Sequence, residues 1–248
     1  MSDRKTLGLF GLGAFGQLAA RCLAPHFDVR AHDPAPDAAA RAAELGVADV
    51  TLEDAAGCEI VVLAMPVQAL EAVCAEIAPH LAEGALVLDV CSVKVQPMAV
   101  MRKALPPHVQ VIGTHPLFGP ESARGGVEGL QIVLCPDPEH DGESRVDCVR
   151  DFLAGTLKLN VFEASPADHD RTMAVVQGLT HLVAKVLSRM NAEAQPFTTM
   201  SFDLMMQSAA LLRHDSEQLF RAIEQMNPYA GDVRRRFFDA ARKLDESL

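Results

Sequence analysis

Hydrophobic residues in the first two-thirds of the chain form short runs, and segments with the length and pattern of helices separate most of them. The runs are apolar throughout rather than alternating with polar residues, which is typical of strands buried on both faces. Strands and helices in alternation predict a mostly parallel sheet that helices cover on both sides. Seven runs are expected to be strands: residues 6–10, 27–33, 59–66, 85–92, 109–116, 130–136 and 158–165.

The pattern changes at Ser165, where SPAD has the residues of a helix start. Ser165 is expected to cap the helix, Pro166 to occupy its first position and Asp168 to complete a capping box. From there to the end of the chain, apolar residues recur with a helical period. We therefore expect an α/β fold, with a Rossmann-type doubly wound sheet in residues 1–164 and a smaller all-α domain in residues 165–248. The second domain is small to stand alone, so it is expected to pack on the first and on a second subunit.

The net charge, the length of the apolar stretches and the cysteines exclude several classes of protein. The 248 residues carry a net charge of -11, which argues against binding to nucleic acid or to an acidic membrane surface. No apolar stretch approaches the roughly 20 residues that span a bilayer, and MSDRKT leads straight into the first expected strand. The six cysteines are scattered without metal-binding spacing. They predict reduced thiols in a cytoplasmic protein and no metal site.

The first expected strand runs directly into GLGAFG, where Gly11, Gly13 and Gly16 have the GxGxxG spacing. In a dinucleotide site these glycines allow a tight turn, a close approach of backbone to pyrophosphate, and close packing of helix on strand. The motif alone is weak, and its alternative reading is a structural glycine turn. The strand before it, the helix after it and an acid at the end of the second strand supply the required context. Cofactor contacts are expected from Gly11, Leu12, Gly13, Ala14, Phe15 and Gly16.

The acid that closes the second expected strand is Asp33, and it bears on the choice of cofactor. A carboxylate at this point accepts hydrogen bonds from the ribose hydroxyls of NAD and repels the extra phosphate of NADP. The alternative reading is a turn aspartate before Pro34. Arg30 and Arg41 lie close enough in sequence to keep NADP possible. NAD is the favoured cofactor.

Ligands of an open α/β sheet bind beyond the carboxyl ends of its strands, so residues at those ends are candidates for the site. Met65 and Pro66 are expected to contact the cofactor, and Thr114 the substrate. His115 is a candidate general base, because an imidazole has a pKa near the working pH. Ser92 is expected to orient that ring or to contact the nicotinamide; a structural histidine is the alternative. A stiff loop is expected to hold His115, with turns at Gly113 and Gly119 and rigid positions at Pro116 and Pro120.

Three segments, CSVK, GTHPLFGPESARGG and DHDRTMAVVQGLTH, resemble the prephenate/arogenate dehydrogenase family of tyrosine biosynthesis. The resemblance implies a nicotinamide-binding domain followed by a helical dimerisation domain, and therefore a homodimer. It implies that His115 is catalytic, with Ser92 beside it at the nicotinamide, and that Gln177 and His181 bind the substrate. The implied reaction moves hydride from the hydroxyl-bearing ring carbon to NAD(P), with loss of CO2 and aromatisation. For His181 a buried structural role stays open, and for His169 the structural role is preferred.

The substrate is either arogenate, which yields tyrosine, or prephenate, which yields 4-hydroxyphenylpyruvate. Glu128 falls where arogenate-preferring members of the family carry an acid, which would pair with the ammonium of arogenate. The arginine that prephenate-preferring members place in the helical domain has no match, because Ala210 stands near its position and Arg213 is displaced. The sequence therefore favours arogenate, with a surface role for Glu128 as the alternative.

Two other functions compete with this one. A β-hydroxyacid dehydrogenase would share the cofactor domain, but no glycine cluster precedes Lys185 and no asparagine follows it closely. A protein that binds NAD to regulate a partner would not need a serine and a histidine at neighbouring strand ends. Both alternatives leave the HPLFGP segment without a role.

Overall fold

In a computed structural model of the chain, the structure describes residues 4–137, 143–190, 195–213 and 215–248. The chain forms two compact units, Met1–Pro166 and Ala167–Leu248. The division falls close to the change of pattern at Ser165, at the start of the first helix of the second unit. In the described residues, no helix has the length and apolar character needed to cross a membrane.

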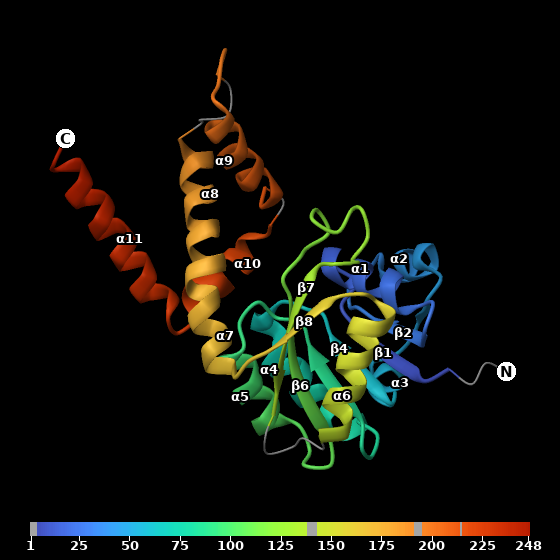
Figure 1. The fold of residues 1–248 in the computed structure, drawn as a ribbon. Helices are drawn as coiled ribbons and strands as arrows, with labels where there is room; N and C mark the ends of the chain where they lie inside the picture. Colours follow the sequence, from blue (N-terminus) through green and yellow to red (C-terminus); the bar gives the residue numbers. More distant parts are fainter. Residues whose placement is uncertain (1–3, 138–142, 191–194, 214) are drawn as a thin grey trace. The chain divides into compact units, whose positions relative to one another are not determined.

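The first unit is built on one eight-stranded sheet with the order β3-β2-β1-β4-β5-β6-β7-β8 (Figure 1). The strands from β1 to β6 pair in parallel, β7 is antiparallel to β6, and β8 is parallel to β7. This confirms the mostly parallel sheet that the apolar runs predict. Each predicted run contains one strand, and only the two-residue β3 was missed. The strands are β1 Thr6–Phe10, β2 Asp28–His32, β3 Ala48–Asp49, β4 Ile60–Leu63, β5 Leu86–Asp89, β6 Gln110–Pro116, β7 Gln131–Pro136 and β8 Asn160–Glu163.

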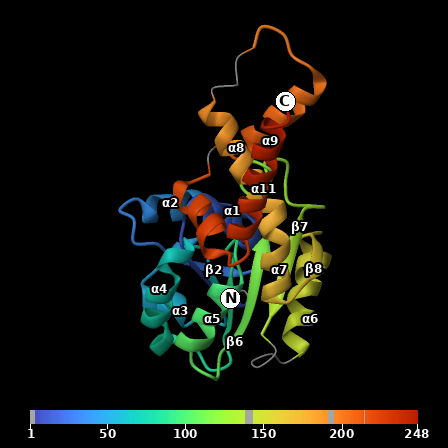
Figure 2. The same ribbon diagram turned by 90° about the vertical axis from the view of Figure 1, so that its left-hand side faces the viewer.

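Helices cover both faces of the sheet, as a doubly wound fold requires. Three of them, α3, α4 and α5, pack over alternate residues of the central strands, including Phe10, Val61 and Val87. The opposite face, with Leu9 and Val62, is covered by α1 and α2, and α6 packs over β5, β6 and β7 on that face (Figure 2). The helices are α1 Ala14–Leu23, α2 Ala38–Leu45, α3 Leu52–Ala56, α4 Leu70–Ile77, α5 Val95–Ala104 and α6 Glu143–Asp151, with short turns η1 Val67–Ala69, η2 Ala78–His80 and the π-helical η3 Phe152–Thr156.

Every regular element among the described residues of the second unit is a helix, which fits the predicted all-α domain. Its first helix begins at Pro166, as the SPAD segment predicts. Thr199 and Ser216 cap α9 and α10, each accepting a hydrogen bond from a backbone N–H three residues later. The elements are α7 Pro166–Met173, the π-helical η4 Ala174–Gly178, α8 Leu179–Arg189, α9 Met200–Leu211, α10 Glu217–Arg221, the π-helical η5 Ala222–Met226 and α11 Ala230–Asp245.

Candidate active site

The glycine loop between β1 and α1 uses its three glycines for three different reasons. Gly11 has a φ of +97°, and a Cβ there would also lie 2.7 Å from the carbonyl oxygen of Ala64. A Cβ at Gly16 would lie 2.0 Å from the carbonyl oxygen of Gly11, so only glycine lets α1 pack this closely. A Cβ at Gly13 would meet nothing within 4 Å. Gly13 therefore faces open space, which is where the backbone must approach a pyrophosphate.

The start of α1 suits an anion. Gly13 is the N-cap without a side-chain hydrogen bond, and the first turn of the helix holds no acidic residue. The free N–H groups and the dipole of such a helix start favour a phosphate. Gly13 and Ala14 are exposed and Phe15 is half-buried, whereas the side chain of Leu12 is fully buried in the core. Of the expected cofactor residues in this loop, Leu12 thus offers backbone atoms only.

Asp33 follows β2 and is fixed against the glycine loop. Its two carboxylate oxygens accept hydrogen bonds from Leu12 N, at 2.6 Å, and from Ala35 N, at 2.8 Å. Arg41 of α2 reaches the same loop, since its Nη1 donates to Leu12 O at 2.9 Å while its guanidinium pairs with Asp37. Each carboxylate oxygen of Asp33 keeps a lone pair for a ribose hydroxyl. A cation and a carboxylate therefore flank the place expected for the adenosine ribose.

The expected contact residues after β4 differ from each other in exposure. Met65 is half-buried and packs against the core cluster under α3, α4 and α5, and Pro66 is exposed at the start of η1. Pro66 and the backbone of Met65 remain available to a ligand at this end of the sheet.

Thr114 and His115 lie within β6, as the predicted strand at residues 109–116 requires, and not in the stiff loop that was also expected to hold His115. The pairing of β6 with β5 ends at Gly113, opposite Asp89, while its pairing with β7 continues through Pro116. The end of β6 therefore projects three residues beyond β5. Thr114 and His115 are buried, at 4% and 3% exposure. His115 is held by an extended strand at the carboxyl edge of the parallel sheet.

Gly113 is also not a turn residue, contrary to the sequence expectation. It lies inside β6, where a Cβ would stand 2.7 Å from Met98 Sδ and 3.2 Å from Lys94 Cδ. The glycine is needed for space, because the side chain of Lys94 passes over it.

Ser92 lies half-buried in the segment between β5 and α5. Its neighbour Cys91 is buried, and Cys91 N donates to Asp89 Oδ2 at 2.9 Å. Burial, together with the nearby Asp89 carboxylate, holds the pKa of the Cys91 thiol well above its usual value. A thiol held protonated in this way is a poor nucleophile, and Ser92 stays the residue of this segment that is expected at the site.

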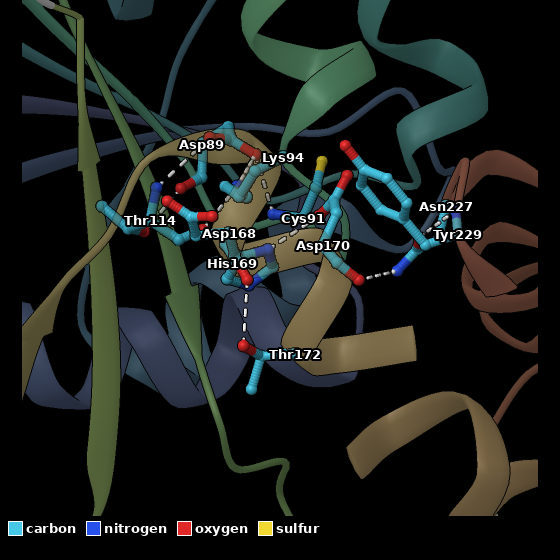
Figure 3. A network of polar contacts seen from close by, with 10 residues as sticks. All are labelled: Asp89, Cys91, Lys94, Thr114, Asp168, His169, Asp170, Thr172, Asn227 and Tyr229. Atoms are coloured by element: carbon cyan, nitrogen blue, oxygen red, sulfur yellow. Dashed lines mark hydrogen bonds and ion pairs between the residues drawn. The ribbon is translucent and has the colours of Figure 1, made fainter. Parts of the chain in front are cut away.

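A buried network that sequence reasoning missed connects this segment to β6. Lys94 and Asp89 form an ion pair whose side chains are both fully buried (Figure 3). Lys94 Nζ also donates to Thr114 O at 2.6 Å, and Thr114 Oγ1 donates to Asp89 O at 2.5 Å. Thr114 was expected to bind substrate, but its hydroxyl makes this internal hydrogen bond. The signal in the sequence was a lysine between β5 and α5, five residues after β5 ends at Asp89.

A cavity of about 570 Å³ lies on the sheet face between α1 and α6–η3. Its lining is mainly apolar and includes Phe15 of the glycine loop, Val90, Thr114 and Phe118. The rings of Phe15 and Phe118 contact each other at a tilt of 41°, with their centroids 6.4 Å apart. The cavity thus extends from Phe15 to Thr114 and Pro116 at the end of β6. His115 does not belong to this lining, because side chains alternate along a strand and its ring points to the opposite face.

In the second unit, Gln177 lies in the π-helical turn η4, a type of turn that is frequent at functional sites. Its Oε1 is buried and has no hydrogen-bond partner within the described ranges. His181, one turn later, places Nδ1 2.9 Å from Gln177 O and Nε2 3.0 Å from Asp215 Oδ2. Both ring nitrogens of His181 therefore have partners inside this unit, which is compatible with the structural alternative and leaves its predicted contact with substrate a prediction. Gln177, by contrast, has a buried acceptor to offer.

Other residues named from the sequence have simpler surroundings. Glu128 is exposed in the turn before β7, beside Gly129, whose N–H donates to Lys158 O at 2.8 Å. Ala210 and Arg213 line a small cavity of about 90 Å³ together with His181.

His169, for which a structural role is preferred from the sequence, is buried in the first turns of α7. Its Nδ1 lies 2.7 Å from Asp170 Oδ1, and Asp170 O accepts from Asn227 Nδ2 at 2.8 Å (Figure 3). Sequence reasoning missed Asp170 and Asn227. In the part of the chain that the structure describes, no group of three or more His, Cys, Asp or Glu side chains could hold a metal ion.

Comparisons with known proteins agree with this geometry. The nucleotide-binding domain of prephenate dehydrogenase matches residues 18–159, and the dimerization domain of prephenate dehydrogenase matches residues 165–247. A probable arogenate/prephenate dehydrogenase of Methanocaldococcus jannaschii is 30% identical over 212 residues, which cover 82% of this chain and 47% of that protein. Arogenate dehydrogenase 1 of Arabidopsis thaliana, a chloroplastic protein, is 28% identical over 99% of this chain and 39% of its own length. The chain thus spans less than half of either relative.

Solved structures show the same fold. Prephenate dehydrogenase from A. aeolicus, in complex with hydroxyphenyl propionate and NAD+, superposes with a TM-score of 0.78 at 22% identity, over 99% of this chain and 91% of that one. Synechocystis arogenate dehydrogenase gives a TM-score of 0.70 at 21% identity, over 97% of this chain and 90% of that one. The two family models together span both units in the order that the sequence motifs predicted. The chain therefore belongs to the prephenate dehydrogenase family of oxidoreductases.

Proposed function

We propose that the chain catalyses the oxidative decarboxylation of a cyclohexadienol carboxylate with a nicotinamide cofactor, and that arogenate is the substrate. The observation that carries the proposal is the placement of His115, buried on the end of β6 that projects past β5, in the same unit as an open glycine loop. A general base at the carboxyl edge of a dinucleotide-binding sheet stands where hydride transfer takes place.

The residues of the chain have separate tasks in this reaction. A bound nicotinamide supplies the hydride acceptor. His115 takes the proton of the ring hydroxyl while hydride leaves the carbon that bears it, and Ser92 orients the imidazole or the nicotinamide. The carbon–carbon bond to the ring carboxylate then breaks and CO2 departs. The electron pair of that bond completes the aromatic ring, and the resulting phenolate oxygen takes the proton back from His115. Gln177 offers its unpartnered Oε1 to the substrate, with His181 beside it.

Arogenate is favoured over prephenate by Glu128, whose exposed carboxylate can pair with an ammonium group. The relatives from Arabidopsis thaliana, whose names specify arogenate, also support arogenate as the substrate. Prephenate is the alternative, supported by the name of the Methanocaldococcus jannaschii relative, which gives both substrates.

NAD is the proposed cofactor because a carboxylate at the end of the second strand, here Asp33, accepts from the ribose hydroxyls of NAD and would repel the extra phosphate of NADP. NADP is the alternative, favoured by Arg41, whose guanidinium hydrogen-bonds to the glycine loop.

The proposed assembly is a homodimer through the helical unit. Four large apolar side chains of α9 are exposed, namely Met200, Leu204, Met205 and Leu211, and α9 has no buried residue. A helix that buries nothing within its own chain is expected to be covered by another surface. The match of this unit to a dimerization domain supports a second copy of the chain as that surface.

The experiment is a turnover assay with the four pairs of arogenate or prephenate and NAD or NADP, following the reduced nicotinamide. Turnover of arogenate with NAD, at least tenfold above the other pairs, is the expected result. A preference for prephenate would keep the reaction and refute the role of Glu128. Cofactor binding without turnover of either substrate would refute the reaction and favour a regulatory NAD-binding protein.

A further inference from the structure

The projecting end of β6 lacks a strand partner on the side of β5. N–H and C=O of one residue in a strand point to the same side. His115 faces β7, with which it pairs opposite Val133, so the N–H and C=O of Thr114 point the other way, past the end of β5. Buried backbone groups in this situation need other partners.

Two side chains supply those partners. Asp89 Oδ1 accepts from Thr114 N at 3.3 Å, and Lys94 Nζ donates to Thr114 O at 2.6 Å. The ion pair between Asp89 and Lys94 joins the two contacts into one buried unit. Asp89 ends β5 and Lys94 precedes α5, so the pair replaces the missing continuation of β5.

Lys94 also lies on the same face of β6 as the catalytic candidate. Side chains alternate along a strand, so the His115 ring and a Cβ at Gly113 point to one face. That face is the one under α5, because a Cβ at Gly113 would meet both Met98 and Lys94. A shift of Lys94 therefore acts on Thr114 through a hydrogen bond and on Gly113 through packing. These are the two residues before His115.

We propose that Asp89 and Lys94 form a positioning pair that fixes the projecting end of β6 and thereby holds the His115 ring in place for proton transfer. The inference rests on the proposed function of His115. It explains why a fully buried lysine is kept, since a buried ion pair is a poor source of stability compared with apolar residues of similar volume. The pair has no net charge, so it orients His115 without adding a net charge to the site.

The test is the double variant Asp89→Asn/Lys94→Met, which removes both charges and so leaves no unpaired buried carboxylate. The single variant Lys94→Met leaves Asp89 unpaired and is expected to melt well below the double variant. The double variant is expected to regain most of the melting temperature and to bind NAD within about twofold of wild type. Its kcat should nevertheless stay about 100-fold low, since a misplacement of about 1 Å costs that much.

The matched control is Arg102→Met/Asp137→Asn. This pair joins α5 to the residue after β7, with Arg102 Nε 2.8 Å from a fully buried Asp137, at the opposite end of β7 from His115. It is expected to lower the melting temperature and to leave kcat within about twofold of wild type. Loss of kcat to the same extent in both double variants would show a general effect of destabilisation and overturn the proposal.

Two further outcomes separate this inference from the proposed function. If wild type turns over substrate and Asp89→Asn/Lys94→Met has full kcat, the positioning role is overturned and the function stands. If wild type is inactive on every substrate, the function fails, and hydrogen–deuterium exchange of the peptide 113–117 decides the anchoring. Exchange about tenfold faster in the Asp89→Asn/Lys94→Met variant supports the anchor, and unchanged exchange overturns it.

Discussion

Replacement of Gly13 by alanine separates cofactor binding from folding. The backbone of Gly13 has φ −65° and ψ −173°, which any residue adopts, and its Cβ would meet no atom within 4 Å. Gly13→Ala is therefore expected to fold with the melting temperature of wild type. The new methyl group would stand in the space through which the backbone approaches a pyrophosphate.

The expected loss can be estimated from the contacts at stake. A hydrogen bond to a charged group is worth roughly 1.5–3 kcal/mol, and the methyl group would cost at least one such bond to the phosphate. Because 1.4 kcal/mol is about tenfold in affinity, the Kd for NAD should rise about 10- to 100-fold. Isothermal titration with NAD measures this change, and differential scanning calorimetry of the same sample measures stability.

Gly16→Ala is the matched comparison, because its Cβ would lie 2.0 Å from the carbonyl oxygen of Gly11. Overpacking of this kind typically costs about 1–3 kcal/mol, so this variant should melt at a lower temperature. A Gly13→Ala protein that binds NAD within about twofold of wild type would refute the assignment of this loop to the pyrophosphate. A Gly16→Ala protein of full stability would refute the packing role of the third glycine.

Three more predictions concern the candidate base, a buried amide and the cysteine thiols. His115→Asn should lower kcat about 100-fold or more, the scale of a general base, with the Kd for NAD unchanged by titration; near-normal turnover would contradict a catalytic role. Gln177→Met should keep the melting temperature of wild type, because Oε1 has no hydrogen-bond partner among the described residues. The KM for substrate should rise about tenfold, which corresponds to the loss of one hydrogen bond. An unchanged KM would show that Gln177 is not part of the site. Iodoacetamide at pH 8 should label exposed Cys148 and spare Cys91 and Cys74. A thiol reacts as its thiolate, and burial raises the pKa of Cys74 to about 12 and that of Cys91 well above its usual value. Mass spectrometry identifies the labelled cysteines, and labelling of Cys91 before Cys148 would contradict the prediction.

The parts of the fold that follow from the sequence are those fixed by local physical chemistry. Buried parallel strands need continuous apolar runs, so seven of the eight strands could be located, and β3, at two residues, is too short to give a pattern. The tight turn of the glycine loop could be predicted because Gly11 has a positive φ and a Cβ at Gly16 would meet the carbonyl oxygen of Gly11, both within the motif. The start of α7 could be placed because Pro166 fits the first position of a helix.

The end of β6 could not be described from the sequence, because its structure depends on partners distant in the chain. The run at residues 109–116 shows a strand, but whether His115 belongs to it depends on β7 extending further than β5. The requirement for Gly113 is likewise set by Met98 and Lys94, so a glycine in a strand was mistaken for a turn. The π-helical turn around Gln177 has no sequence signal of its own, and neither has its unpartnered Oε1.

The glycine loop and the end of β6 are therefore expected to respond differently to substitution. At the glycine loop, backbone atoms are proposed to contact the cofactor. A Cβ would clash at Gly11 and at Gly16 and would meet open space at Gly13. At the end of β6 the reactive ring depends on Asp89 and Lys94, which never reach the substrate in this proposal and whose contacts link three elements. A substitution in the loop should consequently change the Kd for cofactor without changing kcat, whereas one in the buried pair should change kcat without changing the Kd. If substitutions in the loop and substitutions in the buried pair both raised the Kd for cofactor, the end of β6 would be part of the cofactor site. His115 would then lose its separate chemical role.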